Sequence, residues 1–400
     1  MSTARSTATI EPLRVAFVQQ RDARDVRNWS GTLFFSKQAI ARYVGPVIDL
    51  SPAPISALPL RIARGLVRAT TGKSYSYEHD LVIARLYGRY FTEQVRRASP
   101  DLIFAPAGSA CVAFLKTEVP VIYYSDATWR VMQDYHGGLR KVVKRSARGG
   151  EELEQRTLDR AAVALFSSDW AAESAVRDYG ADPDKVHTVY IGANLPHPPA
   201  REQVLPRRLG DTIRLLLVGV SWQAKGADIA FGALLRLLER GYDAELTVVG
   251  CRAPRGVSHP RLRVVPFLNK AIPEQRDQFE QLWREADFFL LPTRFDAAGV
   301  VFCEAAAYAL PALATHTGGV PSLVVEGRNG YTLPPEAGGA EYAALIAELA
   351  SDPERYARLC ETSRDEFEQR LSWDSWGRRV AEIVAERFLQ FRERMPARLW

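Results

Sequence analysis

The sequence has few cysteines and histidines, and neither residue type shows the spacing of a metal or redox motif. The six histidines are dispersed and form no HExxH pattern, so we expect no bound metal. Its four cysteines form no CxxC pair, which favours buried thiols in a reducing compartment. They are Cys111, Cys251, Cys303 and Cys360.

Long apolar runs are also missing. No stretch approaches the roughly 18 apolar residues that a membrane-spanning helix needs. The first residues, MSTARSTATIEPLRVAF, lack the apolar core of a signal peptide. A GxGxxG fingerprint after the first expected strand is absent too, which argues against a dehydrogenase. These absences predict a cytoplasmic protein.

The net charge of +5 is small, but the basic residues are unevenly placed. Between residues 130 and 148, six Lys and Arg residues stand against one acid, Asp134. Within 139–148, apolar residues alternate with the basic ones at roughly helical spacing. This segment is typical of peripheral contact with the inner face of a membrane, of a solvated helix face, or of a pocket for an anionic acceptor. Interleaved aromatic residues are missing, so we expect no nucleic-acid partner.

Apolar segments with the length of strands alternate with helical patterns along the whole chain. This alternation predicts an α/β protein with parallel sheets covered on both faces. A proline-rich polar stretch at 195–211 is the best linker candidate. The strands are expected at 13–20, 46–51, 102–107, 121–127, 163–169 and 186–194, and then at 213–220, 244–250, 261–267, 287–293, 312–315 and 330–334.

The stretch 294–333 carries the strongest functional signal. Asp296 is followed by seven residues and then by Glu304, which we expect at the start of an alanine-rich helix. Another strand-like segment precedes Thr317-Gly318-Gly319-Val320. Acids can accept hydrogen bonds from sugar hydroxyls, and glycines let backbone N–H groups approach an anion. Together these features suit a sugar linked to phosphate.

This stretch resembles the Glu-x7-Glu pattern and downstream GG of retaining family 4 (GT4) glycosyltransferases with the GT-B fold. Asp296 stands in place of the first Glu. The resemblance implies two doubly wound Rossmann-like domains that face one another across a cleft. We expect an N-terminal acceptor-side domain at 1–195, a nucleotide-sugar domain at 196–374, and a terminal helix at 375–400 that packs back on the first domain.

The resemblance also implies the donor site. Glu304 would bind the ribose hydroxyls, Asp296 the transferred sugar, and the N–H groups of Gly318, Gly319 and Val320 the phosphates. Lys225 matches the lysine of the family's G-R-x-x-x-x-K-G loop, which holds the diphosphate. Val220 occupies the position of the family's arginine, so half of the usual cation pair is missing.

In the first domain, two residues are candidates. Gly31 lies in the loop after the first strand, where the family places a glycine near the donor phosphate. Asp126 lies where related enzymes often carry a histidine close to the sugar. It would orient a hydroxyl or cap the following segment. We count it with Asp296 and Lys225 as a catalytic candidate.

The expected reaction is transfer of a hexosyl group from a UDP- or GDP-hexose to an acceptor hydroxyl, with retention and without a metal or other cofactor. The acceptor would be a glycan or a lipid-linked sugar in glycan or glycolipid assembly. Two alternatives remain open. One is a GT-B epimerase or phosphorylase, and the other is a nucleotide-sugar-binding protein without turnover, which the replacements at Val220 and Asp296 motivate.

Overall fold

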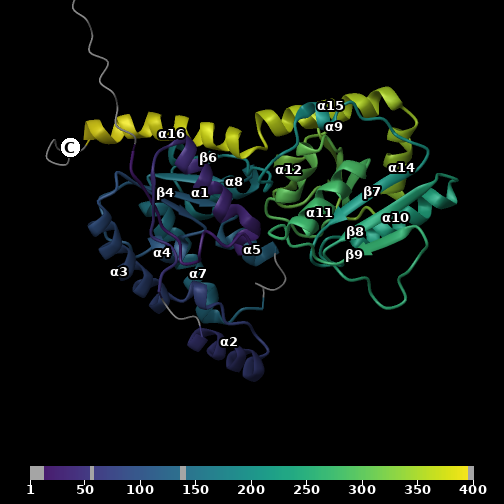
Figure 1. Cartoon of the computed structure of the whole chain (residues 1–400). Helices are drawn as coiled ribbons and strands as arrows, with labels where there is room; N and C mark the ends of the chain where they lie inside the picture. The colour runs from purple at the N-terminus through teal and green to yellow at the C-terminus, as the bar shows by residue number, and fades with distance from the viewer. Residues whose placement is uncertain (1–12, 55–57, 136–140, 395–400) are drawn as a thin grey trace, which may run out of the picture.

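The computed structural model describes residues 13–54, 58–135 and 141–394, and Figure 1 shows that they form two lobes side by side. Each lobe is built on a six-stranded sheet whose paired strands all run parallel. The expected α/β, GT-B architecture is therefore confirmed. Within the described residues, no helix is both long enough and apolar enough to cross a bilayer.

The first sheet has the strand order β2-β1-β3-β4-β5-β6. All six strands fall inside segments expected from the sequence. Their bounds are β1 Val15–Phe17, β2 Val47–Asp49, β3 Leu102–Pro106, β4 Val121–Ser125, β5 Val163–Phe166 and β6 Val186–Thr188. The helices are α1 Thr32–Tyr43, α2 Leu58–Thr71, α3 Leu81–Ala98, α4 Ser109–Val112, α5 Trp129–Tyr135, α7 Lys144–Arg160 and α8 Asp169–Tyr179.

The second sheet has the order β12-β11-β10-β7-β8-β9. Its strands are β7 Ile213–Val218, β8 Ala244–Val249, β9 Leu262–Val265, β10 Phe288–Leu291, β11 Ala312–Thr315 and β12 Gly330–Leu333. The helices are α9 Arg201–Val204, α10 Ala227–Glu239, α11 Pro273–Glu285, α12 Val300–Ala307, α13 Val320–Leu323, α14 Gly339–Ala350, α15 Pro353–Gln369 and α16 Trp373–Arg394.

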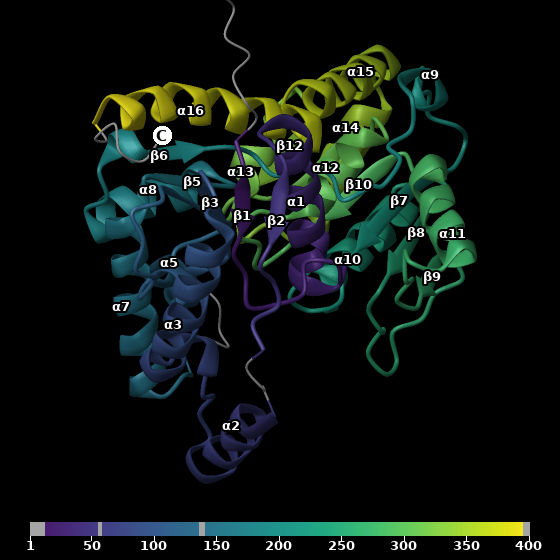
Figure 2. The same ribbon diagram turned by 60° about the vertical axis from the view of Figure 1, so that its left-hand side comes forward.

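The terminal helix α16 lies along the first lobe in both views (Figures 1 and 2). Its residues Trp376, Val380 and Ile383 are buried in one cluster with residues of α1 and of β1, β3 and β5. The opposite face of this sheet is covered by α3, α4 and Leu153 of α7. Burial of the apolar stripe of α16 thus ties the end of the chain to the first domain.

Strand order locates the places where ligands bind. In each sheet the order reverses once, between β1 and β3 in the first sheet and between β7 and β10 in the second. Crevices outside the carboxyl ends of strands at such switch points are the usual ligand sites of open α/β sheets. The loops that follow β1, β3, β7 and β10 are therefore the first places to look for a site.

Candidate functional site

Lys225 and Asp296 meet at the switch point of the second sheet. Lys225 lies in the turn between β7 and α10, and Asp296 in the loop after β10. Lys225 Nζ lies 2.5 Å from Asp296 Oδ2 and donates to the Phe295 carbonyl at 3.3 Å. Both side chains are largely buried, with 21% and 11% exposed. Sequence reasoning selected both residues, and the fold makes them an ion pair.

Glu304 lies in the interior of a helix, which corrects the expectation that it begins one. α12 starts at Val300 with Gly299 as its N-cap, so Glu304 stands in the second turn. Its carboxylate is buried and Oε1 accepts from Lys270 Nζ at 2.8 Å. Lys270 Nζ also donates to the Asn194 carbonyl at 3.1 Å. A cation, and not the amino end of the helix, therefore balances the charge of Glu304.

The glycine pair allows two loops to pack closely. A Cβ at position 319 would lie 1.9 Å from the Ala297 carbonyl oxygen, and Gly318 has φ +54°. The Gly319 N–H donates to the Asp296 carbonyl at 3.2 Å, and the Val320 N–H to the Thr317 carbonyl at 3.1 Å. A bound phosphate would compete with these carbonyls for the two amides. The phosphate contacts of Gly318, Gly319 and Val320 stay a prediction.

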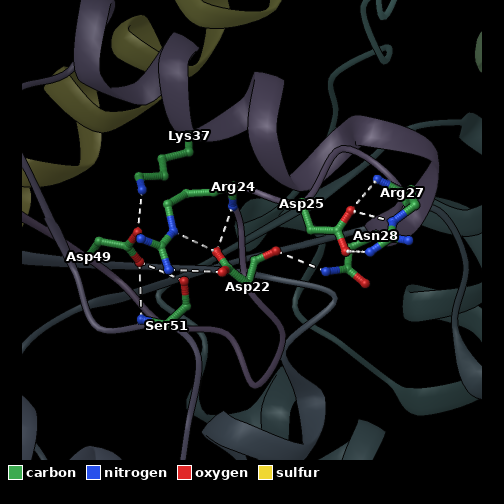
Figure 3. A network of polar contacts seen from close by, with 8 residues as sticks. All are labelled: Asp22, Arg24, Asp25, Arg27, Asn28, Lys37, Asp49 and Ser51. Carbon is green, nitrogen blue, oxygen red and sulfur yellow. Dashed lines mark hydrogen bonds and ion pairs between the residues drawn. The ribbon is translucent and has the colours of Figure 1, made fainter. Parts of the chain in front are cut away.

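The loop after β1 leads into a strained turn at Gly31. Figure 3 shows the polar network of the preceding residues, in which Arg24 pairs with Asp22 and Arg27 with Asp25. Three consecutive residues, 29 to 31, then adopt positive φ angles, including Trp29 at +49° and Ser30 at +55°. Non-glycine residues in this region cost about 1 kcal/mol or more each and concentrate at functional sites.

Asp126 directly follows β4 in the first domain. Its Oδ2 accepts from Trp29 Nε1 at 2.8 Å, so the strained turn holds the carboxylate. Burial raises the pKa of Asp126, and the negative charge of Asp296 raises it further. The two predicted acids, one from each domain, are thus close enough to repel one another.

Tyr135 at the end of α5 joins the two domains beside the predicted donor site. Its hydroxyl hydrogen-bonds to Thr317 Oγ1 at 2.7 Å and accepts from the Asp296 N–H at 3.2 Å. Its ring packs on Phe295 with 4.5 Å between centroids. Sequence reasoning missed Tyr135, Lys270 and Asn194. Of these three residues, only Lys270 had a signal in the sequence that could have marked it as a candidate, because it follows a strand-like segment.

Two family models match the chain. The model described as "Glycosyl transferases group 1" matches residues 212–352, and the model described as "Glycosyltransferase Family 4" matches residues 50–196. The chain belongs to the GT4 glycosyltransferases. The first match contains Lys225, Asp296 and Glu304, and the second contains Asp126.

Curated relatives of this glycosyltransferase include two D-inositol 3-phosphate glycosyltransferases. The protein from Corynebacterium kroppenstedtii is 25% identical over 284 residues, which cover 64% of this chain and 62% of the relative. The one from Streptomyces bingchenggensis is 30% identical over 262 residues, covering 61% and 56%. The chain thus spans about 60% of the length of the relatives it matches.

Solved structures resemble this glycosyltransferase over nearly its whole length. Sucrose-phosphate synthase from Thermosynechococcus elongatus gives a TM-score of 0.65 at 15% identity, covering 94% of this chain and 100% of that one. HepE from Anabaena, solved with UDP and glucose, gives 0.59 at 16% identity, covering 93% and 99%. At such identities the likeness shows the fold alone.

Asp296→Glu restores the residue usual in the family, and we expect it to lower activity. Asp296 is buried, and its Oδ2 already lies 2.5 Å from Lys225 Nζ. An extra methylene would push this carboxylate out of its pairing position, and a charged group misplaced by about 1 Å in a reaction centre can cost about 10²-fold in rate, so kcat for donor hydrolysis should fall by about tenfold or more. Asp159→Glu, on the exposed side of α7, is the matched control.

An unchanged or higher kcat for Asp296→Glu would show that this loop keeps the family's spacing. Asp296→Ala should lower activity in either case, because it leaves Lys225 without the carboxylate with which it pairs.

Proposed function

We propose that this glycosyltransferase moves a hexosyl group from a nucleoside-diphosphate sugar to an acceptor hydroxyl, with retention at the anomeric carbon and without a metal. The observation that carries the proposal is the Lys225–Asp296 pair at the β7/β10 switch point, with Asp126 of the other domain near enough for the charge of Asp296 to act on it. One site thus combines a cation for a leaving diphosphate with carboxylates that can hold sugar hydroxyls.

The proposed roles follow from charge. Transfer leaves negative charge on the diphosphate while positive charge develops at the sugar. Lys225 would stabilise the diphosphate, and Asp296 would accept a hydroxyl of the transferred sugar beside it. Glu304, held by Lys270, would accept the ribose hydroxyls. HepE, a relative in fold, was solved with UDP and glucose, which supports UDP-hexose as the first donor to test.

Donor hydrolysis tests this function directly. The purified protein should cleave one of the UDP-, GDP- or ADP-hexoses slowly without an acceptor, because water replaces the acceptor hydroxyl. NMR of the sugar transferred to an acceptor should show the donor's anomeric configuration. No cleavage of any donor, or inversion at the anomeric carbon, would contradict the proposal.

A nucleotide-sugar-binding protein without turnover is the second candidate. Val220 favours it, because this side chain is 73% exposed where the family carries an arginine for the diphosphate. Thermal shift separates the two functions, since a ligand that binds the native state raises the melting temperature. Stabilisation by a nucleotide sugar without any cleavage would identify the binding protein. An epimerase would instead convert the sugar of the donor into its epimer. A phosphorylase would need free phosphate as a substrate.

For the cellular setting, we propose glycan or glycolipid assembly in the cytoplasm at the inner face of a membrane. All four cysteines are free and buried, which supports a reducing compartment. The predicted contact segment 139–148 lies partly outside the described residues, at positions 139 and 140. In the described part of this segment, Val142 is buried and forms an isolated β-bridge with Ser74, and helix α7 starts at Lys144.

The helix α2 offers a better membrane surface than this segment. Figures 1 and 2 both show α2 standing out from the first lobe. Ile62 and Leu66 are 57% and 63% exposed, one turn apart. By helical spacing, three arginines that make no ion pair within the described chain lie on the opposite side of the helix, and α2 contains no acid. They are Arg61, Arg64 and Arg68. Such a helix suits an anionic lipid surface.

We expect the protein to sediment with phosphatidylglycerol vesicles and not with phosphatidylcholine vesicles. The double variant Ile62→Ser/Leu66→Ser should weaken this binding by about tenfold or more, because each lost side chain removes buried apolar area worth about 1.5 kcal/mol or more. Val82→Ser, at an exposed position of α3, is the matched control. Equal binding to both vesicles, or no effect of the double variant, would contradict this contact.

A further inference from the structure

A cavity of about 210 Å³ lies in the first domain at the switch point of its sheet. Gln19 follows β1, Ala107 follows β3, and Ser125 ends β4, so three carboxyl strand ends open into it. Trp29, which holds the carboxylate of Asp126, lines its wall. Through Trp29 the cavity therefore adjoins Asp126, a residue of the proposed reaction centre.

The cavity contains little net positive charge. Arg21 is the one Lys or Arg among its lining residues within the described chain, and it pairs with Glu78 at 2.5 Å. Burial lowers the pKa of His79 to about 4, and its ring lies 4.1 Å from that of Trp129, so the imidazole is neutral at pH 7. No lining cation is thus left unmatched by an acid.

A buried carboxyl group faces the same space. Glu154 of α7 is 4% exposed and accepts from the Tyr123 hydroxyl at 3.1 Å. Burial raises the pKa of Glu154 to about 8, so this group is mostly protonated at pH 7. It can then both donate and accept hydrogen bonds. Gln19, Gln20 and Thr128 add further neutral polar groups.

This lining discriminates between acceptors by charge. A phosphate dianion would lose its hydration in a cavity that offers no free cation and holds a carboxyl group, at a cost of several kcal/mol. A hydroxylated ring would instead meet neutral donors and acceptors together with the aromatic faces of Trp29 and Trp129. The lining thus favours an acceptor rich in hydroxyls and free of charge.

Building on the proposed function, we propose that this cavity is the acceptor subsite and that it takes an uncharged polyhydroxylated ring, a sugar or cyclitol that carries no phosphate. The curated relatives are named for an acceptor that does carry one. The substrate class of this chain would therefore differ from theirs.

Matched acceptor pairs test the inference. With the donor found by hydrolysis, kcat/KM is measured for myo-inositol against its 3-phosphate and for glucose and its methyl glycoside against glucose 6-phosphate. We expect the uncharged member to be favoured by about tenfold or more, which corresponds to about 1.4 kcal/mol. Two outcomes would overturn this inference and leave the proposed function standing. One is a preference for the phosphorylated acceptor, and the other is hydrolysis of the donor without transfer to any uncharged acceptor. Absence of donor cleavage would instead overturn the proposed function.

Glu154→Gln supplies the second test. In the wild type, kcat/KM for the acceptor should fall by about tenfold per pH unit above about 8, because ionised Glu154 can no longer donate a hydrogen bond. In Glu154→Gln this fall should disappear. Glu152→Gln, two residues away in a surface ion pair with Arg156, should keep the wild-type profile. The titratable groups that face Glu154 from its neighbours are Tyr123, Asp126, Glu151 and Tyr179.

If kcat/KM for the acceptor still fell above pH 8 in Glu154→Gln, Glu154 would not belong to the subsite. If the preference for uncharged acceptors also vanished in the matched pairs, the cavity would have no role in choosing the acceptor.

Discussion

Lys225→Ala should lower kcat for donor cleavage by about 10²-fold or more. The substitution removes a preorganised cation from the place where diphosphate charge develops, and one such group is commonly worth 10²–10³-fold. Val220, exposed at the position of the family's arginine, supplies no charge that could compensate. The loss also leaves Asp296 buried without its partner and close to Asp126.

Two variants separate these two effects. Lys225→Arg keeps the charge and should retain more activity than Lys225→Ala. Asp296→Asn combined with Lys225→Ala removes the unpaired carboxylate. Recovery of activity in this double variant would mean that Lys225 acts only by neutralising Asp296. Lys116→Ala, at an exposed position outside the site, is the matched control. Near wild-type kcat for Lys225→Ala would show that another cation holds the diphosphate.

The strands could be predicted because their signal is local. Each expected apolar segment contains the strand that the structure shows. The signal is clearest for β1, β3, β4, β5, β10 and β11, which are buried throughout, because buried parallel strands are apolar on both faces. The start of α12 could not be predicted in the same way. Val300, Val301 and Phe302 have side chains that favour a strand, so the helix seemed to begin only at Glu304. Gly299, with φ +79°, starts it earlier.

The ion pairs of the site depend on the fold and not on sequence distance. Lys225 and Asp296 are 71 residues apart and meet because β7 and β10 are neighbours at the switch point. Lys270 and Glu304 are 34 residues apart and come from a loop and a helix of the same domain. Sequence motifs name Lys225, Asp296 and Glu304 but not Lys270, and only the fold shows which cation lies opposite which acid.

The contact between the domains was beyond sequence reasoning for the same reason. Tyr135 lies at the end of α5, in a basic region whose expected partners were lipids or an anionic acceptor. Its hydroxyl instead hydrogen-bonds to Thr317 and to the Asp296 backbone. Such a contact depends on how the two sheets face each other, which no local pattern encodes.

Glu304→Ala should abolish donor binding while the fold remains intact. In the proposed site its carboxylate accepts two ribose hydroxyls, and hydrogen bonds to a charged group contribute about 1.5–3 kcal/mol each. Loss of both corresponds to a rise in the donor Kd of about 10²-fold or more. Lys270 keeps the Asn194 carbonyl as an acceptor and is 31% exposed, so it loses little when its carboxylate partner goes.

Calorimetry with UDP and with the preferred nucleotide sugar measures this effect, and thermal unfolding checks that the variant folds. Glu304→Gln retains one acceptor oxygen and the side-chain shape, so it should bind more weakly than the wild type and more tightly than Glu304→Ala. Glu336→Ala, at an exposed surface position, is the matched control. An unchanged Kd for Glu304→Ala would take Glu304 out of the donor site. Its pairing with Lys270 would then be only structural, because a buried carboxylate needs a partner whether or not it binds a ligand.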